Sequence, residues 1–78
     1  PNPFNPSTTL SYTLARPMQV ELSVYNLMGQ QVRTLAFGLQ DAGEYSVPFT
    51  AGELASGVYV VELKAGGHSQ TQKVLLIK

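Results

Sequence analysis

Residues 18–25 read Met-Gln-Val-Glu-Leu-Ser-Val-Tyr, and this stretch decides the fold. Apolar and polar side chains alternate along it, beginning with the apolar Met18. Successive side chains of a β-strand point to opposite faces, so one face of this segment is apolar and the other is mostly polar. The pattern predicts a strand that packs its apolar face against a core.

Alternating apolar residues, and at 58–63 β-branched and aromatic ones, predict further short strands on both sides of this stretch. They cover residues 8–15, a shorter segment with Val32 and Leu35, residues 45–49, residues 58–63 and residues 71–77. Arg16-Pro17 ends the first strand, because proline cannot donate a hydrogen bond to a ladder. For the same reason Pro48 predicts that its strand lies at a sheet edge.

Glycine, asparagine and proline mark the connections between these strands. We predict a hairpin turn at residues 26–30, in which Gly29 adopts positive φ. We predict a glycine-containing connection at residues 37–43 and a second hairpin turn at residues 65–68. Residues 50–57 predict a loop that places Leu54 in the core. Six or seven strands with turns every eight to twelve residues predict an all-β fold, an immunoglobulin-like antiparallel β-sandwich with Greek-key connections.

Length and composition limit what the chain can do. Its 78 residues predict one domain, residues 1–78, with residues 1–7 as a proline-rich lead-in. Five Lys and Arg balance five Asp and Glu, which argues against a nucleic-acid partner or an anionic membrane surface. No cysteine is present to form a disulfide, and no apolar run is long enough to insert into a membrane. The chain begins at Pro1 without Met, and we interpret it as a piece of a longer protein.

Catalytic and metal-binding patterns are weak. The single histidine, His68, falls in a predicted turn, where a solvated polar residue is ordinary. A hydrolytic triad would need His68 together with the single aspartate, Asp41, and no nucleophile elbow accompanies them. Asp41, Glu44 and Glu53 lack calcium-loop spacing, so we interpret them as solvated loop carboxylates. The sequence predicts neither an enzyme nor a cofactor site.

The four tyrosines raise the possibility of a sugar-binding platform. Tyr12, Tyr45 and Tyr59 share the phase of core residues, so core packing is the favoured interpretation. Tyr25 is out of phase, and with Phe37 it is the remaining candidate for an exposed aromatic surface. Carbohydrate binding is therefore the least favoured of the functions considered.

Four segments of the chain resemble a known family. They are Pro-Asn-Pro-Phe-Asn-Pro-Ser-Thr-Thr at 1–9, Val-Tyr-Asn-Leu-Met-Gly-Gln-Gln-Val at 24–32, Leu-Ala-Ser-Gly-Val-Tyr at 54–59 and Lys-Val-Leu-Leu-Ile-Lys at 73–78. Together they resemble the type A C-terminal sorting domain of the bacterial type IX secretion system. They also resemble a related immunoglobulin-like domain of the flagellar hook-capping protein.

The motif residues also have a physical interpretation. They are Pro1, Asn2, Pro3, Phe4, Asn5, Pro6, Gly29, Gly57 and Tyr59. The prolines stiffen the lead-in, and Phe4 can cover one end of the sandwich. Gly29 and Gly57 supply turn backbone, and Tyr59 fills the core after such a turn.

The resemblance implies a non-catalytic label on a larger exported protein. It implies recognition of the domain by the type IX outer-membrane machinery, and export of the N-terminal cargo domain through the periplasm to the cell surface or medium of a Gram-negative bacterium. Whether a peptidase then removes the domain and the cargo is attached to the surface stays open. The alternative is a structural or adhesive immunoglobulin-like module.

The final strand is the predicted recognition surface. Its residues are Lys73, Val74, Leu75, Leu76, Ile77 and Lys78. An exposed edge strand can be joined by a partner strand through main-chain hydrogen bonds. Either Val74 and Leu76 or Leu75 and Ile77 face the core, and the alternation alone does not decide between these pairs.

Overall fold

The computed structural model of the chain describes residues 7–77, which form six β-strands. The strands are β1 (Ser7–Leu14), β2 (Met18–Tyr25), β3 (Gln31–Gln40), β4 (Gly43–Thr50), β5 (Gly57–Ala65) and β6 (His68–Leu76). The predicted all-β fold is confirmed, and Pro17, the turn at 26–30 and the turn at Gly66 and Gly67 separate strands as expected. The six N-terminal motif residues Pro1 to Pro6, together with Lys78, lie outside the described residues.

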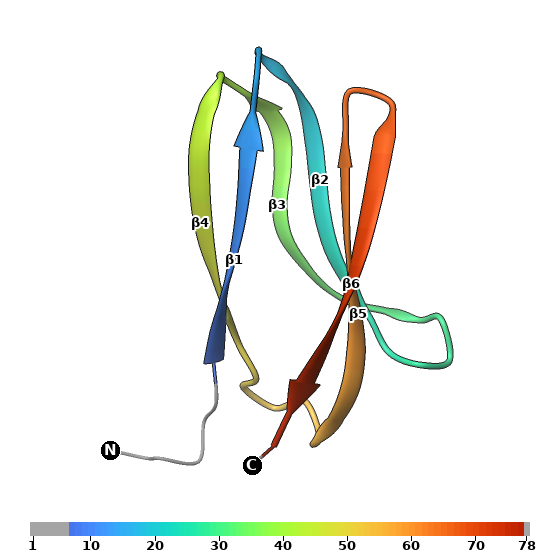
Figure 1. Cartoon of the computed structure of the whole chain (residues 1–78). Coiled ribbons are helices and arrows are strands. Elements are labelled where there is room, and N and C mark those ends of the chain that lie inside the picture. Colours follow the sequence, from blue (N-terminus) through green and yellow to red (C-terminus); the bar gives the residue numbers. More distant parts are fainter. Residues whose placement is uncertain (1–6, 78) are drawn as a thin grey trace.

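The strands form two antiparallel sheets that pack face to face. One contains β1 and β4, and the other has the order β3-β2-β5-β6 (Figure 1). The chain changes sheet after β1, after β3 and after β4, and β4 returns to pair with β1, which is the return link of a Greek key. This arrangement is consistent with the predicted immunoglobulin-like sandwich. Pro48 lies in β4, an edge strand, as predicted.

The core lies between the two sheets and draws on five strands and the β4–β5 loop. Its buried residues are Leu10, Leu22, Val24, Phe49, Ala51, Tyr59, Val61 and Leu76. Val20, Leu22 and Val24 are buried as the alternation in residues 18–25 predicts. Leu54 packs against this core from the loop before β5, which confirms its predicted placement. Tyr12 packs against the same cluster and stacks on Tyr45, with ring centroids 5.2 Å apart.

The strand boundaries that differ most from the sequence prediction are the end of β3 and the start of β6. β3 continues through Gln40, so residues 37–40 are strand and not connection. β6 begins at His68, because Gly66 and Gly67, both at positive φ, close a turn short enough for Ala65 to pair with His68. His68 is therefore the first residue of a strand. In β3 the exposed Phe37 and Leu39 continue the strand through Gly38, which the sequence prediction took as part of a connection. In β6 the first five residues are polar and give no apolar alternation.

Candidate recognition surface

Strand β6 lies at the edge of the four-stranded sheet. It pairs with β5 from Gly57 opposite Leu76 to Ala65 opposite His68, and among residues 7–77 its second edge pairs with no strand. An edge strand presents a row of backbone N–H and C=O groups on its unpaired side. The predicted recognition strand therefore has a backbone edge that a partner strand can join.

The structure decides which residues of β6 face the core. Leu76 is buried and Val74 is half-buried against the core cluster. Leu75 and Ile77 are 61% and 68% exposed, and Lys73 is exposed as well. The first of the two predicted pairs is therefore the inward one. Of the predicted recognition residues, Lys73, Leu75 and Ile77 are available to a partner.

The exposed side chains of β6 continue onto β5 across the outer face of the sheet. Val58 lies opposite Leu75, and Val60 lies opposite Lys73. Residues directly opposite each other on antiparallel strands share one face, so these four form an apolar strip with one lysine. Farther along β5, Glu62 accepts a hydrogen bond from Ser69 Oγ at 3.3 Å, and one of its oxygens lies 4.0 Å from Lys64 Nζ. The strip is thus bordered by a polar cluster.

The turn between β2 and β3 is closed by its own hydrogen bonds. Asn26 Oδ1 accepts from the backbone N–H groups of Met28 at 2.9 Å and Gln30 at 3.0 Å, and Asn26 Nδ2 donates to Gln30 Oε1 at 2.8 Å. Gly29 has a φ of 83°, which a side chain would strain. The Val-Tyr-x-x-x-Gly-x-x-Val segment at 24–32 therefore specifies a rigid turn, and its predicted positive-φ glycine is confirmed.

This turn projects from the sandwich (Figure 1). It holds Leu27 and Met28 in solvent, 69% and 82% exposed. A hollow of about 470 Å³ lies beside the turn, lined by Tyr25, Leu27 and Val60 among others. Sequence reasoning did not name Leu27 or Met28 as functional residues. The available signal was the presence of two large apolar residues inside a predicted hairpin turn, between Asn26 and Gly29.

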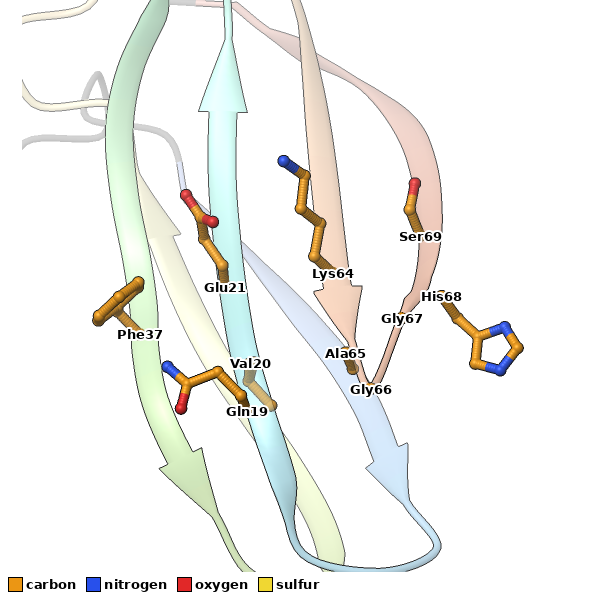
Figure 2. A pocket seen from close by; sticks show the side chains of 10 residues that line it. All are labelled: Gln19, Val20, Glu21, Phe37, Lys64, Ala65, Gly66, Gly67, His68 and Ser69. Atoms are coloured by element: carbon orange, nitrogen blue, oxygen red, sulfur yellow. The ribbon is translucent and has the colours of Figure 1, made fainter.

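A second hollow lies on the outer face near the β5–β6 turn, with a volume of about 380 Å³ (Figure 2). Phe37, Glu21 and Lys64 stand on this face, whereas His68 points away from them. Tyr25 and Phe37 do not form one aromatic platform. Phe37 pairs with Glu21, four residues from Tyr25 along β2, so the two rings belong to rows about 13 Å apart at about 3.3 Å per residue.

Within residues 7–77 no group of three His, Asp or Glu side chains is placed to hold a metal ion. His68, Asp41, Glu44 and Glu53 are exposed. In the same part of the chain no helix is long and apolar enough to cross a membrane.

The Leu-Ala-Ser-Gly-Val-Tyr segment at 54–59 forms a corner between the two sheets. The Tyr59 ring is buried, and its hydroxyl donates to the Ala55 carbonyl at 2.6 Å. The Leu54 N–H donates to the Ala51 carbonyl at 2.9 Å, and Gly57 has a φ of 155° as β5 begins. A tyrosine that bonds back to the backbone a few residues upstream is a tyrosine corner, a feature of immunoglobulin-like sandwiches. The motif residues Gly57 and Tyr59 thus build the sandwich.

Comparison with known proteins agrees with this structural account. The family model described as "Secretion system C-terminal sorting domain" matches residues 1–78, the full length given. Searches of the curated proteins and of the solved structures found no match. The chain therefore belongs to the family of secretion system C-terminal sorting domains and is a sorting signal for type IX secretion.

Proposed function

We propose that the type IX machinery reads this domain through the outward side of the β5–β6 hairpin, with β6 as the strand that the partner joins. The observation that carries the proposal is the combination of a free backbone edge with exposed apolar side chains at Leu75 and Ile77. Main-chain hydrogen bonds to the edge supply affinity, and pockets for alternate side chains supply specificity. Lys73 adds a positive charge to the apolar strip, at the end nearest the polar cluster.

In this proposal the domain acts as a label and performs no chemistry. Family membership implies a larger cargo protein, recognition by the type IX machinery and a destination at the cell surface or in the extracellular space. We assign the receptor to the outer-membrane part of that machinery in a Gram-negative cell. Removal of the domain by a sorting peptidase after export is part of the same proposal.

The test is a secretion assay with a reporter fused in front of this chain in a type IX-competent bacterium. The variant Leu75→Glu/Ile77→Glu places two charges on the outward side of β6 and leaves the core residues Val74 and Leu76 unchanged. We expect the reporter to remain in the periplasm while the domain stays folded. Normal export of this variant would contradict the proposal.

Leu39→Glu is the matched control. Leu39 is 74% exposed and lies on β3, at the opposite edge of the same sheet. The substitution adds the same charged side chain at similar exposure. We expect export of this variant at the unsubstituted level, and circular dichroism of each purified domain separates a loss of recognition from a loss of fold.

A further inference from the structure

The two-stranded sheet covers only part of the four-stranded one. On the inner side of β6, Leu76 and Val74 are covered, whereas Gln72, Gln70 and His68 are exposed although they share the same phase. The difference arises because β1 and β4 are the only described strands in the other sheet. Near the β5–β6 turn the sandwich is therefore open on one side.

A groove lies on this open side, between β1 and β6. Two adjoining hollows of about 130 and 280 Å³ form it, and both are lined by Tyr12, Leu63 and Gln70. Its floor is apolar, with Val61 and Leu63 of β5. On the β1 side it runs along residues 10–15, about 17 Å at about 3.3 Å per residue. That length matches an extended segment of about six residues.

The backbone edge of β1 that borders the groove has no strand partner. Within the described chain β1 pairs only with β4, so alternate residues of β1 turn their N–H and C=O groups toward the groove. A strand placed in the groove would therefore gain ladder hydrogen bonds and would cover the apolar floor.

The composition of β1 distinguishes it from the other three edge strands. Edges are normally protected by charge, proline or bulges. β4 carries Glu44 and Pro48, β3 carries Arg33 and has register irregularities in its pairing with β2, and β6 carries Lys73. β1 reads Ser-Thr-Thr-Leu-Ser-Tyr-Thr-Leu and has none of these. Its edge is the least protected against an added strand.

We propose that β1 accepts an extended, uncharged segment of a partner polypeptide as a third strand of its sheet, seated in this groove. The described lining contains no Asp, Glu, Lys or Arg, and His68 stands at one end. A charged side chain that entered the groove would lose water without gaining an ion partner. The segment thus presents apolar side chains to Leu63 and neutral polar ones to solvent.

The groove admits a single strand and excludes a second copy of this sandwich related by two-fold symmetry. Antiparallel pairing of β1 with β1 of a second copy would put both four-stranded sheets on the same side of the joined strands. There they would occupy the same space, since β6 already extends beneath the free edge of β1. This binding surface is separate from the outward side of β6, so this proposal does not depend on the one made for β6.

The experiment uses the 78-residue chain and the capped peptide Thr-Val-Thr-Val-Thr-Val at millimolar concentration, followed by amide hydrogen exchange in nuclear magnetic resonance spectra. We expect exchange at alternate β1 amides to slow by about tenfold, as ladder pairing at a strand edge requires. The matched peptide Thr-Lys-Thr-Lys-Thr-Lys should give no such protection.

Variants on the two faces of β6 sharpen the test. Gln70→Lys places a charge in the groove and should weaken peptide binding by about tenfold, whereas Ser69→Lys, on the opposite face of β6, should leave it unchanged. Three results would overturn the proposal: no protection by the uncharged peptide, equal protection by the lysine peptide, or protection confined to β3 or β6.

Discussion

The two ends of β6 differ in burial although their inward side chains share one phase. At the end near Leu76 the strand is covered by the core that includes Phe49, Ala51 and Tyr59. At the other end Gln70 and Gln72 face the same way into an open groove. Burial along this strand therefore depends on how far the opposite sheet extends. It also separates the part of the domain that provides stability from the part that is free to bind.

The largest expected effect is at the covered end. Phe49 is fully buried, and Phe49→Ala should lower the free energy of unfolding by about 3–5 kcal/mol, from transfer and cavity costs together. A domain this small has only about that much stability, so the variant should be largely unfolded at 25 °C. Gln72→Ala at the open end should change the free energy of unfolding by less than about 0.5 kcal/mol. Urea unfolding monitored by circular dichroism measures the free energy of unfolding of both variants. Similar losses in Phe49→Ala and Gln72→Ala would contradict the separation between a stabilising end and an open end of the domain.

Arg33 should give the next largest effect, because it ties β3 to the end of β4. Its Nη1 donates to the Thr50 carbonyl at 2.9 Å, its Nη2 donates to the Ala51 carbonyl at 3.1 Å, and its guanidinium lies 5.7 Å from the Phe49 ring centroid. Arg33→Met should cost about 2 kcal/mol of unfolding free energy, since charged hydrogen bonds are lost. The exposed Arg16→Met serves as control in the same assay, and an equal loss there would show that the contacts of Arg33 contribute nothing specific.

Tyr59→Phe should have a smaller effect. The substitution keeps the ring in the core and removes the hydroxyl that bonds to the Ala55 carbonyl. We expect a loss of about 1 kcal/mol of unfolding free energy, the usual net value of one hydrogen bond. Tyr25→Phe removes a hydroxyl from the outer face, and a loss as large as that of Tyr59→Phe would argue against a stabilising tyrosine corner.

The smallest effect concerns alkaline pH. Burial raises the pKa of the Tyr12 phenol above its usual 10.0, the hydrogen bond to Gln40 lowers it in part, and the nearby Tyr45 raises it. Folding therefore favours the protonated phenol. This contribution is complete below pH 10.0 and is lost as pH rises through the higher folded-state pKa. Thermal unfolding from neutral to alkaline pH should show a slightly steeper decline for the unsubstituted chain than for Tyr12→Phe, and parallel declines would contradict the assignment.

Most of the fold follows from local pattern, and its exceptions have identifiable causes. Strict alternation of apolar and polar residues predicted β2, and Pro48 predicted that β4 is an edge strand. Register shifts between β2 and β3 let both Leu35 and Ala36 face the core. These neighbouring inward residues break the period of two, so the alternation did not predict the full length of β3. The sequence pattern did not predict where β6 begins, because the inward residues at this end of the strand are polar and face an open groove.

The candidate site could be predicted only in part. The sequence indicated the final strand and narrowed its inward residues to two pairs, but the choice between Leu76 and Leu75 depends on the register with β5. The groove beside β1 could not be predicted, because it results from the unequal number of strands in the two sheets. The relation to the flagellar hook-capping domain stays a prediction.

Recognition through β6 can be tested by site-specific photo-crosslinking in live, secreting cells that export a reporter fused to this chain. A photoreactive residue replaces Leu75, Ile77 or, as control, Leu39, one at a time. We expect adducts with a component of the type IX machinery from positions 75 and 77 and none from position 39. Normal secretion with adducts only from position 39 would contradict recognition through β6.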